Sequence, residues 1–86
     1  MSKKEKLLGR LRTTPRPKDF TWAEATTLLA AYGFKLHPTG GGSGRMFVHE
    51  QTRVKLRLHE PHPEKTLKPY MVDQLLEGLR NAGVIE

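Results

Sequence analysis

Apolar side chains recur with a helical period in three segments of this 86-residue chain. The positions concerned are Leu7, Leu8 and Leu11; Trp22, Ala25, Leu28, Leu29 and Tyr32; and Val72, Leu75, Leu76 and Leu79. Spacings of three and four residues place such side chains on one face of a helix. The pattern predicts a short helix over residues 3–12, a clear helix over 22–32 and a last helix that begins near Pro69.

The ends of these helices carry their own signals. Thr21 and Glu24 have the spacing of a capping box, in which each side chain accepts a backbone N–H of the other residue. Gly33 follows the second helix where a left-handed cap is expected, and Gly83 does the same for the last helix. Pro69 suits the first position of a helix, because no intrahelical bond needs its missing N–H.

Apolar and polar residues alternate in three segments between the second and last helices, namely 34–37, 45–49 and 53–59. Alternation predicts strands, because neighbouring side chains point to opposite faces of a sheet. We expect Phe34, Leu36, Met46, Val48, Val54, Leu56 and Leu58 on the core side. Lys35, His37, Arg45, Phe47, His49, Arg53, Lys55, Arg57 and His59 are then expected on the solvent side.

The order of elements predicts an α+β fold with a three-stranded antiparallel sheet and two helices on one face. Pro61 and Pro63 exclude residues 60–64 from the sheet and make them a connection. The short helix and its linker, residues 1–18, are expected to precede a main domain of residues 19–86.

Charge is distributed unevenly along the chain. Residues 1–18 carry seven Lys and Arg side chains and one Glu, and therefore the whole net charge of +6. A basic arm favours a polyanionic partner such as nucleic acid, although a merely solvated tail is the alternative. The chain has no Cys and no apolar run of membrane-spanning length, so we expect a cytoplasmic protein that makes no use of a membrane.

The glycine-rich stretch from Thr39 to Phe47 contains four of the eight glycines. It lacks the Gly-Lys-Ser/Thr ending of a nucleoside triphosphate loop. Two interpretations remain open: a flexible hairpin, or a nest of backbone N–H groups that binds phosphate beside Arg45. The four histidines have neither metal-ligand spacing nor Cys partners, so no metal site is expected.

The predicted solvent face of the sheet suggests nucleic-acid chemistry. Lys and Arg at alternate strand positions match a line of phosphates, and an outward Phe47 would stack a base. Imidazole groups can move protons near neutral pH, as metal-free RNA cleavage requires. The alternative is an ordinary polar face with no ligand.

Three segments together resemble the HicA family of bacterial toxin–antitoxin toxins. They are "FTWAEATTLLAAYGF", "TGGGSGRMF" and "HPEKTLKPYMVDQLLEGLRNAGV", which cover nearly all of residues 20–84. The resemblance implies a fold similar to the double-stranded-RNA-binding domain. It also implies a metal-independent mRNA-cleaving endoribonuclease without a cofactor, which a HicB-type antitoxin keeps inactive.

The chain departs from that family at one position. The family pattern Gly-Ser-His, whose His is the presumed catalytic residue, appears here as Gly42-Ser43-Gly44. The remaining candidates for proton transfer are His62, which matches the tail motif, and His49 and His59 at strand ends. The candidate RNA-binding residues are Lys35, Gly42, Ser43, Gly44, Arg45, Phe47, Arg53, Lys55, Arg57 and Lys65. The alternative is a degenerate toxin that binds RNA or antitoxin without cleaving.

Overall fold

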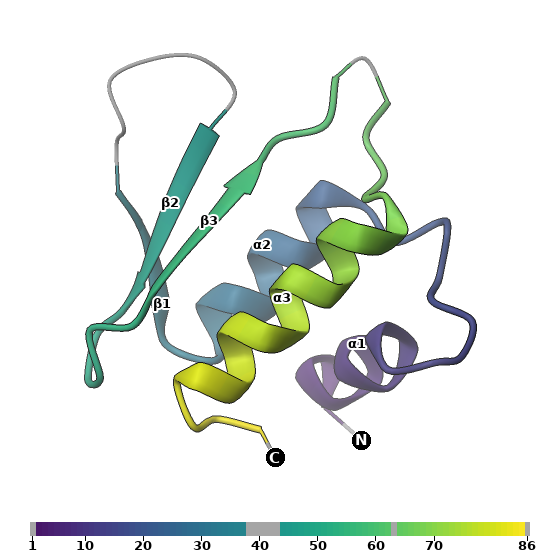
Figure 1. The fold of residues 1–86 in the computed structure, drawn as a ribbon. Coiled ribbons are helices and arrows are strands. Elements are labelled where there is room, and N and C mark those ends of the chain that lie inside the picture. The colour runs from purple at the N-terminus through teal and green to yellow at the C-terminus, as the bar shows by residue number, and fades with distance from the viewer. Residues whose placement is uncertain (1, 38–43, 63, 86) are drawn as a thin grey trace.

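The computed structural model describes residues 2–37, 44–62 and 64–85 (Figure 1). Its elements in chain order are α1 (Lys3–Leu11), α2 (Trp22–Ala31), β1 (Phe34–His37), β2 (Gly44–His49), β3 (Lys55–His59) and α3 (Pro69–Asn81). The predicted order of helices and strands is therefore confirmed. None of the helices in these described ranges has both the length and the apolar character that a membrane span needs.

The three strands form one antiparallel sheet in the order β1-β2-β3. Helices α2 and α3 lie side by side against one face of the sheet, and α1 lies against the helices (Figure 1). The predicted α+β arrangement, with two helices on one face and a short basic helix in front, is confirmed.

Local signals determine where the helices begin and end. The Thr21 hydroxyl accepts the Glu24 backbone N–H, and the Glu24 carboxylate accepts the Thr21 N–H, which completes the predicted capping box. Gly33, directly after α2, has a φ of 89°, in the left-handed region that favours glycine. Pro69 occupies the first turn of α3, as predicted.

Helix α1 contributes to the same core as the rest of the chain. Leu7 and Leu11 are buried in the main hydrophobic cluster, and Leu11 has no exposed surface. Phe20, at the end of the following linker, is also fully buried. Helix α1 is therefore packed on the body of the protein through Leu7 and Leu11.

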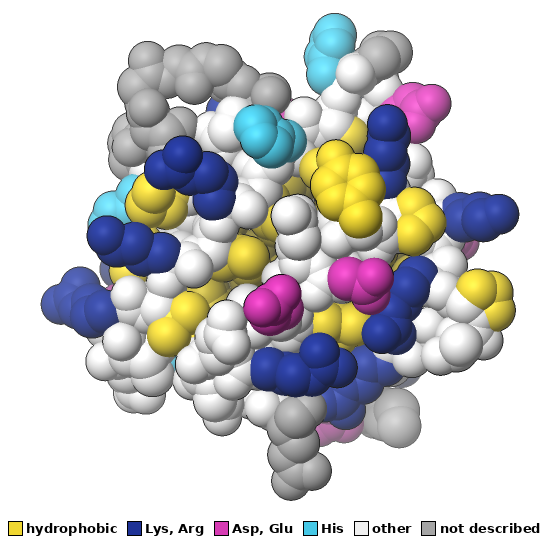
Figure 2. All heavy atoms as spheres, viewed as in Figure 1, with side chains coloured by type: hydrophobic (Ala, Val, Ile, Leu, Met, Phe, Trp, Pro, Cys, Tyr) yellow, Lys and Arg dark blue, Asp and Glu magenta, His cyan; other side chains and the backbone are white. Residues whose placement is uncertain are grey.

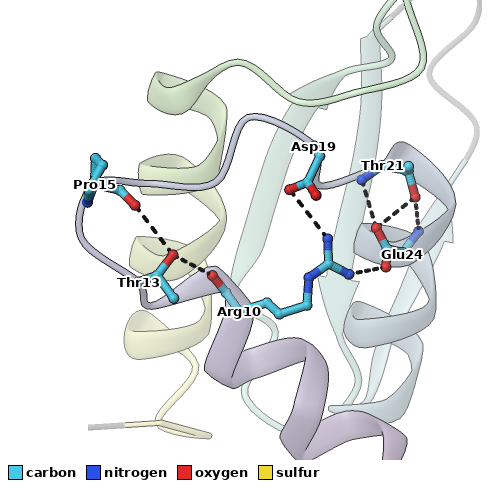
Figure 3. Close-up of polar contacts among 6 residues, drawn as sticks. All are labelled: Arg10, Thr13, Pro15, Asp19, Thr21 and Glu24. Carbon is cyan, nitrogen blue, oxygen red and sulfur yellow. Dashed lines mark hydrogen bonds and ion pairs between the residues drawn. The ribbon is translucent and has the colours of Figure 1, made fainter.

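Arg10 of α1 forms an ion pair with Glu24 in the capping box of α2 (Figure 3). The Arg10 guanidinium donates to Glu24 and lies 3.5 Å from Asp19. Partial burial alone would raise the pKa of Glu24, but hydrogen bonds from the Thr21 backbone and from Arg10 outweigh it and lower that pKa. Arg16 forms a second tie, with its Nε 2.8 Å from Asp73 of α3.

The ion pair predicts a pH-dependent part of the stability. Folding lowers the pKa of Glu24. Ionised Glu24 therefore stabilises the folded protein above the ordinary pKa of 4.5, and this stabilisation is lost as the pH falls below that value. Glu24→Gln keeps an acceptor for the Thr21 N–H but removes the charge. We expect this variant to be less stable by about 1 kcal/mol at pH 7, with the difference shrinking in acid. Urea unfolding from pH 7 to pH 3 measures it, and parallel stability curves for the two proteins would contradict the assignment.

The predicted faces of β2 are wrong. Phe47 pairs with Leu56, and Arg45 pairs with the fully buried Leu58, so odd-numbered residues of β2 face the helices. Met46 and Val48 instead lie on the outer face. Residues 46–48 are three consecutive apolar residues, so their pattern fits either orientation. Phe47 buries the largest of these side chains, with its ring centroid 5.9 Å from that of Trp22.

The predicted start of the third strand is also wrong. Arg53 has a φ of 64° and belongs to the turn, where its N–H donates to the His49 carbonyl oxygen. The ladder with β2 begins at Lys55. Alternation extends through the turn in sequence, but a positive φ cannot continue a strand.

Candidate functional site

A hollow of about 280 Å³ lies where β3 ends and the connection to α3 begins. Its polar lining includes His59, His62, Glu60, Glu64, Lys68 and Tyr70, and it is called the histidine pocket below. Histidine side chains are visible in the upper part of the view in Figure 2. The residues that line the pocket carry two imidazoles, one ammonium group, two carboxylates and an exposed aromatic ring.

Backbone pairing holds the connection that forms this pocket. Thr66 makes an isolated antiparallel bridge with Thr21. The Trp22 N–H donates to the Lys65 carbonyl oxygen at 2.8 Å, and the Leu67 N–H donates to the Phe20 carbonyl oxygen at 2.7 Å. The start of α2 therefore positions the pocket, although the two segments are some forty residues apart in the sequence.

The side chains of the pocket reach it from different elements. His59 is the last residue of β3, and His62 follows within the connection. Lys68 caps α3 through its backbone, and Tyr70 in the first turn of α3 is 57% exposed although it is aromatic. Arg45, on β2, places its guanidinium 3.3 Å from Glu60, so this pocket carboxylate has a counter-charge.

The start of β2 lies beside the end of β3. Gly44 is the strand partner of His59, and a Cβ added at Gly44 would lie 3.9 Å from Cε1 of the His59 ring. That distance is an ordinary van der Waals contact, and Gly44 is not among the described residues with positive φ. The backbone at this position would therefore accept a side chain, which would emerge beside His59.

The outer face of the sheet carries a second cluster. Lys35 and Lys55 are in register with Val48 between them, and Arg57 is in register with Met46. All three cations are exposed, and the group is called the cationic face: Lys35, Lys55 and Arg57. The Lys35 ammonium lies 3.5 Å from Glu50. Positive charge thus lines both edges of a short apolar strip on the side of the sheet opposite the helices.

A comparison with protein-family models matches residues 22–84 to the HicA toxin of bacterial toxin–antitoxin systems. The chain belongs to the HicA toxin family. It is therefore a toxin of a toxin–antitoxin system, and an antitoxin is its expected partner. Comparisons with curated proteins and with solved structures gave no match. The family match begins at α2, so α1 precedes the matched region.

Within this HicA family member, the structure separates His49 from the other candidate histidines. His49 ends β2, whereas Gly44 beside His59 begins it. The His49 side chain is buried, packs edge-on to Phe34, and accepts the Thr52 N–H through Nδ1 at 3.1 Å. An imidazole nitrogen that accepts a backbone N–H carries no proton, so the other ring nitrogen does. This arrangement supports the β2–β3 turn and does not bring His49 to the histidine pocket.

The other predicted site residues lie in several places. Phe47 is only 3% exposed, so the prediction that it stacks a base on the solvent face is wrong. Arg53 lies in the β2–β3 turn, at the end of the sheet away from Gly44. Lys65 is exposed in the connection before α3. Gly42 and Ser43 lie outside the described residues.

Lys68 and Tyr70 line the pocket but were not predicted as site residues. The sequence does place both at the start of α3. Lys68 directly precedes Pro69, and Tyr70 lies outside the buried stripe of the helix. Nothing in the sequence at these two positions predicts that they line a pocket together with the connection after β3. Within residues 2–37, 44–62 and 64–85, no group of three or more His, Cys, Asp or Glu side chains could hold a metal ion.

Proposed function

We propose that this HicA family toxin is a cytoplasmic endoribonuclease that cleaves mRNA and is held inactive by a HicB-type antitoxin. Family membership supports the toxin role. The observation that carries RNA cleavage is the histidine pocket, where His59 and His62 line one hollow together with Lys68. Such a set offers proton transfer and a positive charge for a phosphodiester.

The cationic face supports binding of the RNA strand. Phosphates along a single strand attract lines of Lys and Arg, and their contacts release counterions. The exposed Tyr70 ring at the pocket offers a stacking surface of the kind that unpaired bases use. Together, these features fit an unpaired RNA segment that reaches the pocket from the sheet. The following residues remain predictions as RNA-binding residues: Gly42, Ser43, Gly44, Arg45, Arg53 and Lys65.

Binding through the cationic face predicts a defined salt dependence. Each phosphate contact with single-stranded RNA contributes about 0.7 to the slope of log affinity against log salt concentration. Replacement of Lys35, Lys55 and Arg57 by Gln is expected to lower that slope by about 2. Arg80→Gln, which removes an exposed arginine from the far end of α3, is the matched control and is expected to leave the slope unchanged. Fluorescence titration of a labelled RNA measures both, and equal slopes for all three proteins would contradict RNA binding by this face.

Expression in bacteria tests the proposed function as a whole. Induction without an antitoxin is expected to arrest growth and fragment mRNA, and co-expression of a HicB-type antitoxin is expected to restore both. His62→Ala, expressed to the same level, is expected to reduce fragmentation. Normal growth and intact mRNA at verified expression of the natural chain would contradict the proposal.

Gly44 favours one second candidate, a degenerate toxin that binds RNA or antitoxin without cleavage. Glycine has no group that exchanges protons, so loss of a loop histidine would remove a catalytic group unless another replaces it. This candidate predicts that the natural chain is inactive and that Gly44→His is active. Northern blots of a defined transcript after induction of each protein separate the two functions.

A further inference from the structure

The geometry points to His59 as the catalytic histidine of this chain, delivered from β3 to a position directly beside the one from which a side chain at position 44 of β2 would project. His62 is its partner in proton transfer. This assignment rests on the proposed function and names the residues that carry it out. It also accounts for a glycine at a position where the backbone does not require one.

The start of β2 meets the end of β3 at Gly44 and His59. Gly44 and His59 are paired residues on one face of the sheet, and the His59 ring lies 3.9 Å from a Cβ built on Gly44. A side chain at 44 would therefore project alongside the imidazole. The two positions are alternative origins for a group at the same end of the sheet.

His59 lies at the edge of a hollow that other candidate groups also line. The residue is exposed at the end of β3 and lines the histidine pocket with His62, Lys68 and Tyr70. His37 and His49 are not among the residues that line the pocket. Of the histidines in the described residues, His59 and His62 thus share one hollow.

Two imidazoles can supply both proton transfers that RNA cleavage requires. Cleavage of RNA at a 2′-hydroxyl needs a base on one side of the phosphorus and an acid on the other. One neutral imidazole takes the proton of the 2′-hydroxyl while the 2′-oxygen forms a bond to phosphorus. The bond from phosphorus to the 5′-oxygen breaks, and the other imidazole, protonated beforehand, gives its proton to that oxygen. The products are a 2′,3′-cyclic phosphate and a 5′-hydroxyl, and no further reactant is consumed.

Lys68 has a separate part in this arrangement. Lys68 lines the pocket at the start of α3, and its ammonium would supply positive charge for the phosphate oxygens, on which charge increases during the reaction. Arg45 lies beside Glu60, so the neighbouring carboxylate repels an incoming phosphate less. Lys68 and Arg45 thus offset the two pocket carboxylates, Glu60 and Glu64, beside the groups that move protons.

A histidine exchange between the strands tests the assignment. Single-turnover cleavage of one end-labelled RNA is measured for the natural chain, His59→Ala, and His59→Ala combined with Gly44→His. His59→Ala is expected to slow cleavage by about 100-fold or more, within the range for loss of an acid–base group. The exchanged double variant is expected to recover at least tenfold of this loss. His59→Ala with Gly44→Ala is the matched control, because it adds a side chain at 44 without an imidazole, and no recovery is expected.

The outcomes separate two kinds of failure. A natural chain that does not cleave would overturn the proposed function itself. Cleavage by His59→Ala at the rate of the natural chain would overturn only the assignment of His59. If the exchanged double variant is no faster than His59→Ala, the claim that a histidine at position 44 can replace His59 would be overturned. RNA affinity within about threefold and an unchanged thermal midpoint for each variant exclude loss of binding or of folding as the cause.

Discussion

Phe47→Ala is expected to destabilise the protein by about 3–5 kcal/mol, as is usual when a buried aromatic side chain is removed. Phe47 is 3% exposed and packs against Trp22 of α2 at a ring-centroid distance of 5.9 Å. Domains of this size are commonly stable by about 4–13 kcal/mol, so the loss is a large share of the total. Urea unfolding followed by tryptophan fluorescence measures it directly.

The neighbouring residue is the matched control for this prediction. Met46 lies on the outer face of the same strand and is partly exposed, so Met46→Ala is expected to cost less than about 1 kcal/mol. If β2 had the opposite orientation, Met46→Ala would be the damaging change and Phe47→Ala the mild one. The pair of variants therefore tests which side of β2 faces the helices, independently of any measurement on RNA.

Leu11→Ala is expected to cost about 2–5 kcal/mol, although it lies outside the region that matches the family. Leu11 is fully buried in the common core, whereas Leu8 on the same helix is only partly buried. Leu8→Ala is therefore the matched control, with a smaller expected loss. Equal and negligible losses in the two variants would show that α1 does not pack on the body of the protein.

This packing changes how the basic N-terminal residues should be studied. Deletion of residues 1–18 would remove Leu7 and Leu11 from the core, so a loss of RNA or antitoxin binding would be confounded by unfolding. Replacement of the exposed Lys3, Lys6 and Arg12 by Gln keeps the leucines and removes only charge. Arg10 and Arg16 are unsuitable for this purpose, because they pair with Glu24 and Asp73.

Features set by neighbours in the sequence could be predicted. The capping box of Thr21 and Glu24, the left-handed Gly33 and the start of α3 at Pro69 depend on a few adjacent residues. The orientation of β2 could not be predicted, since residues 46–48 are all apolar and the choice depends on the contact of Phe47 with Trp22. Arg53 was misplaced because alternation in the sequence does not reveal a positive φ in a turn.

The candidate site depends more strongly on distant contacts. His59 and His62 were recognisable as chemically useful residues, but their common pocket depends on the pairing of Thr66 with Thr21. The backbone pairing of Gly44 with His59 follows from the register of β2 and β3, which alternation alone does not give. Gly78 is similar: a Cβ there would lie 2.7 Å from a Leu56 side-chain carbon, so the helix accepts a weak helix former where it contacts the sheet.

The most direct test of the account uses one RNA and its 2′-deoxy counterpart. The purified chain, in EDTA, is incubated with an RNA that it cleaves and with the same strand carrying deoxyribose only at the cleaved nucleotide. We expect cleavage of the RNA to a 2′,3′-cyclic phosphate and a 5′-hydroxyl, and no cleavage at the deoxyribose, because the attacking oxygen is absent there. Cleavage of both strands at the same rate would contradict attack by the 2′-oxygen.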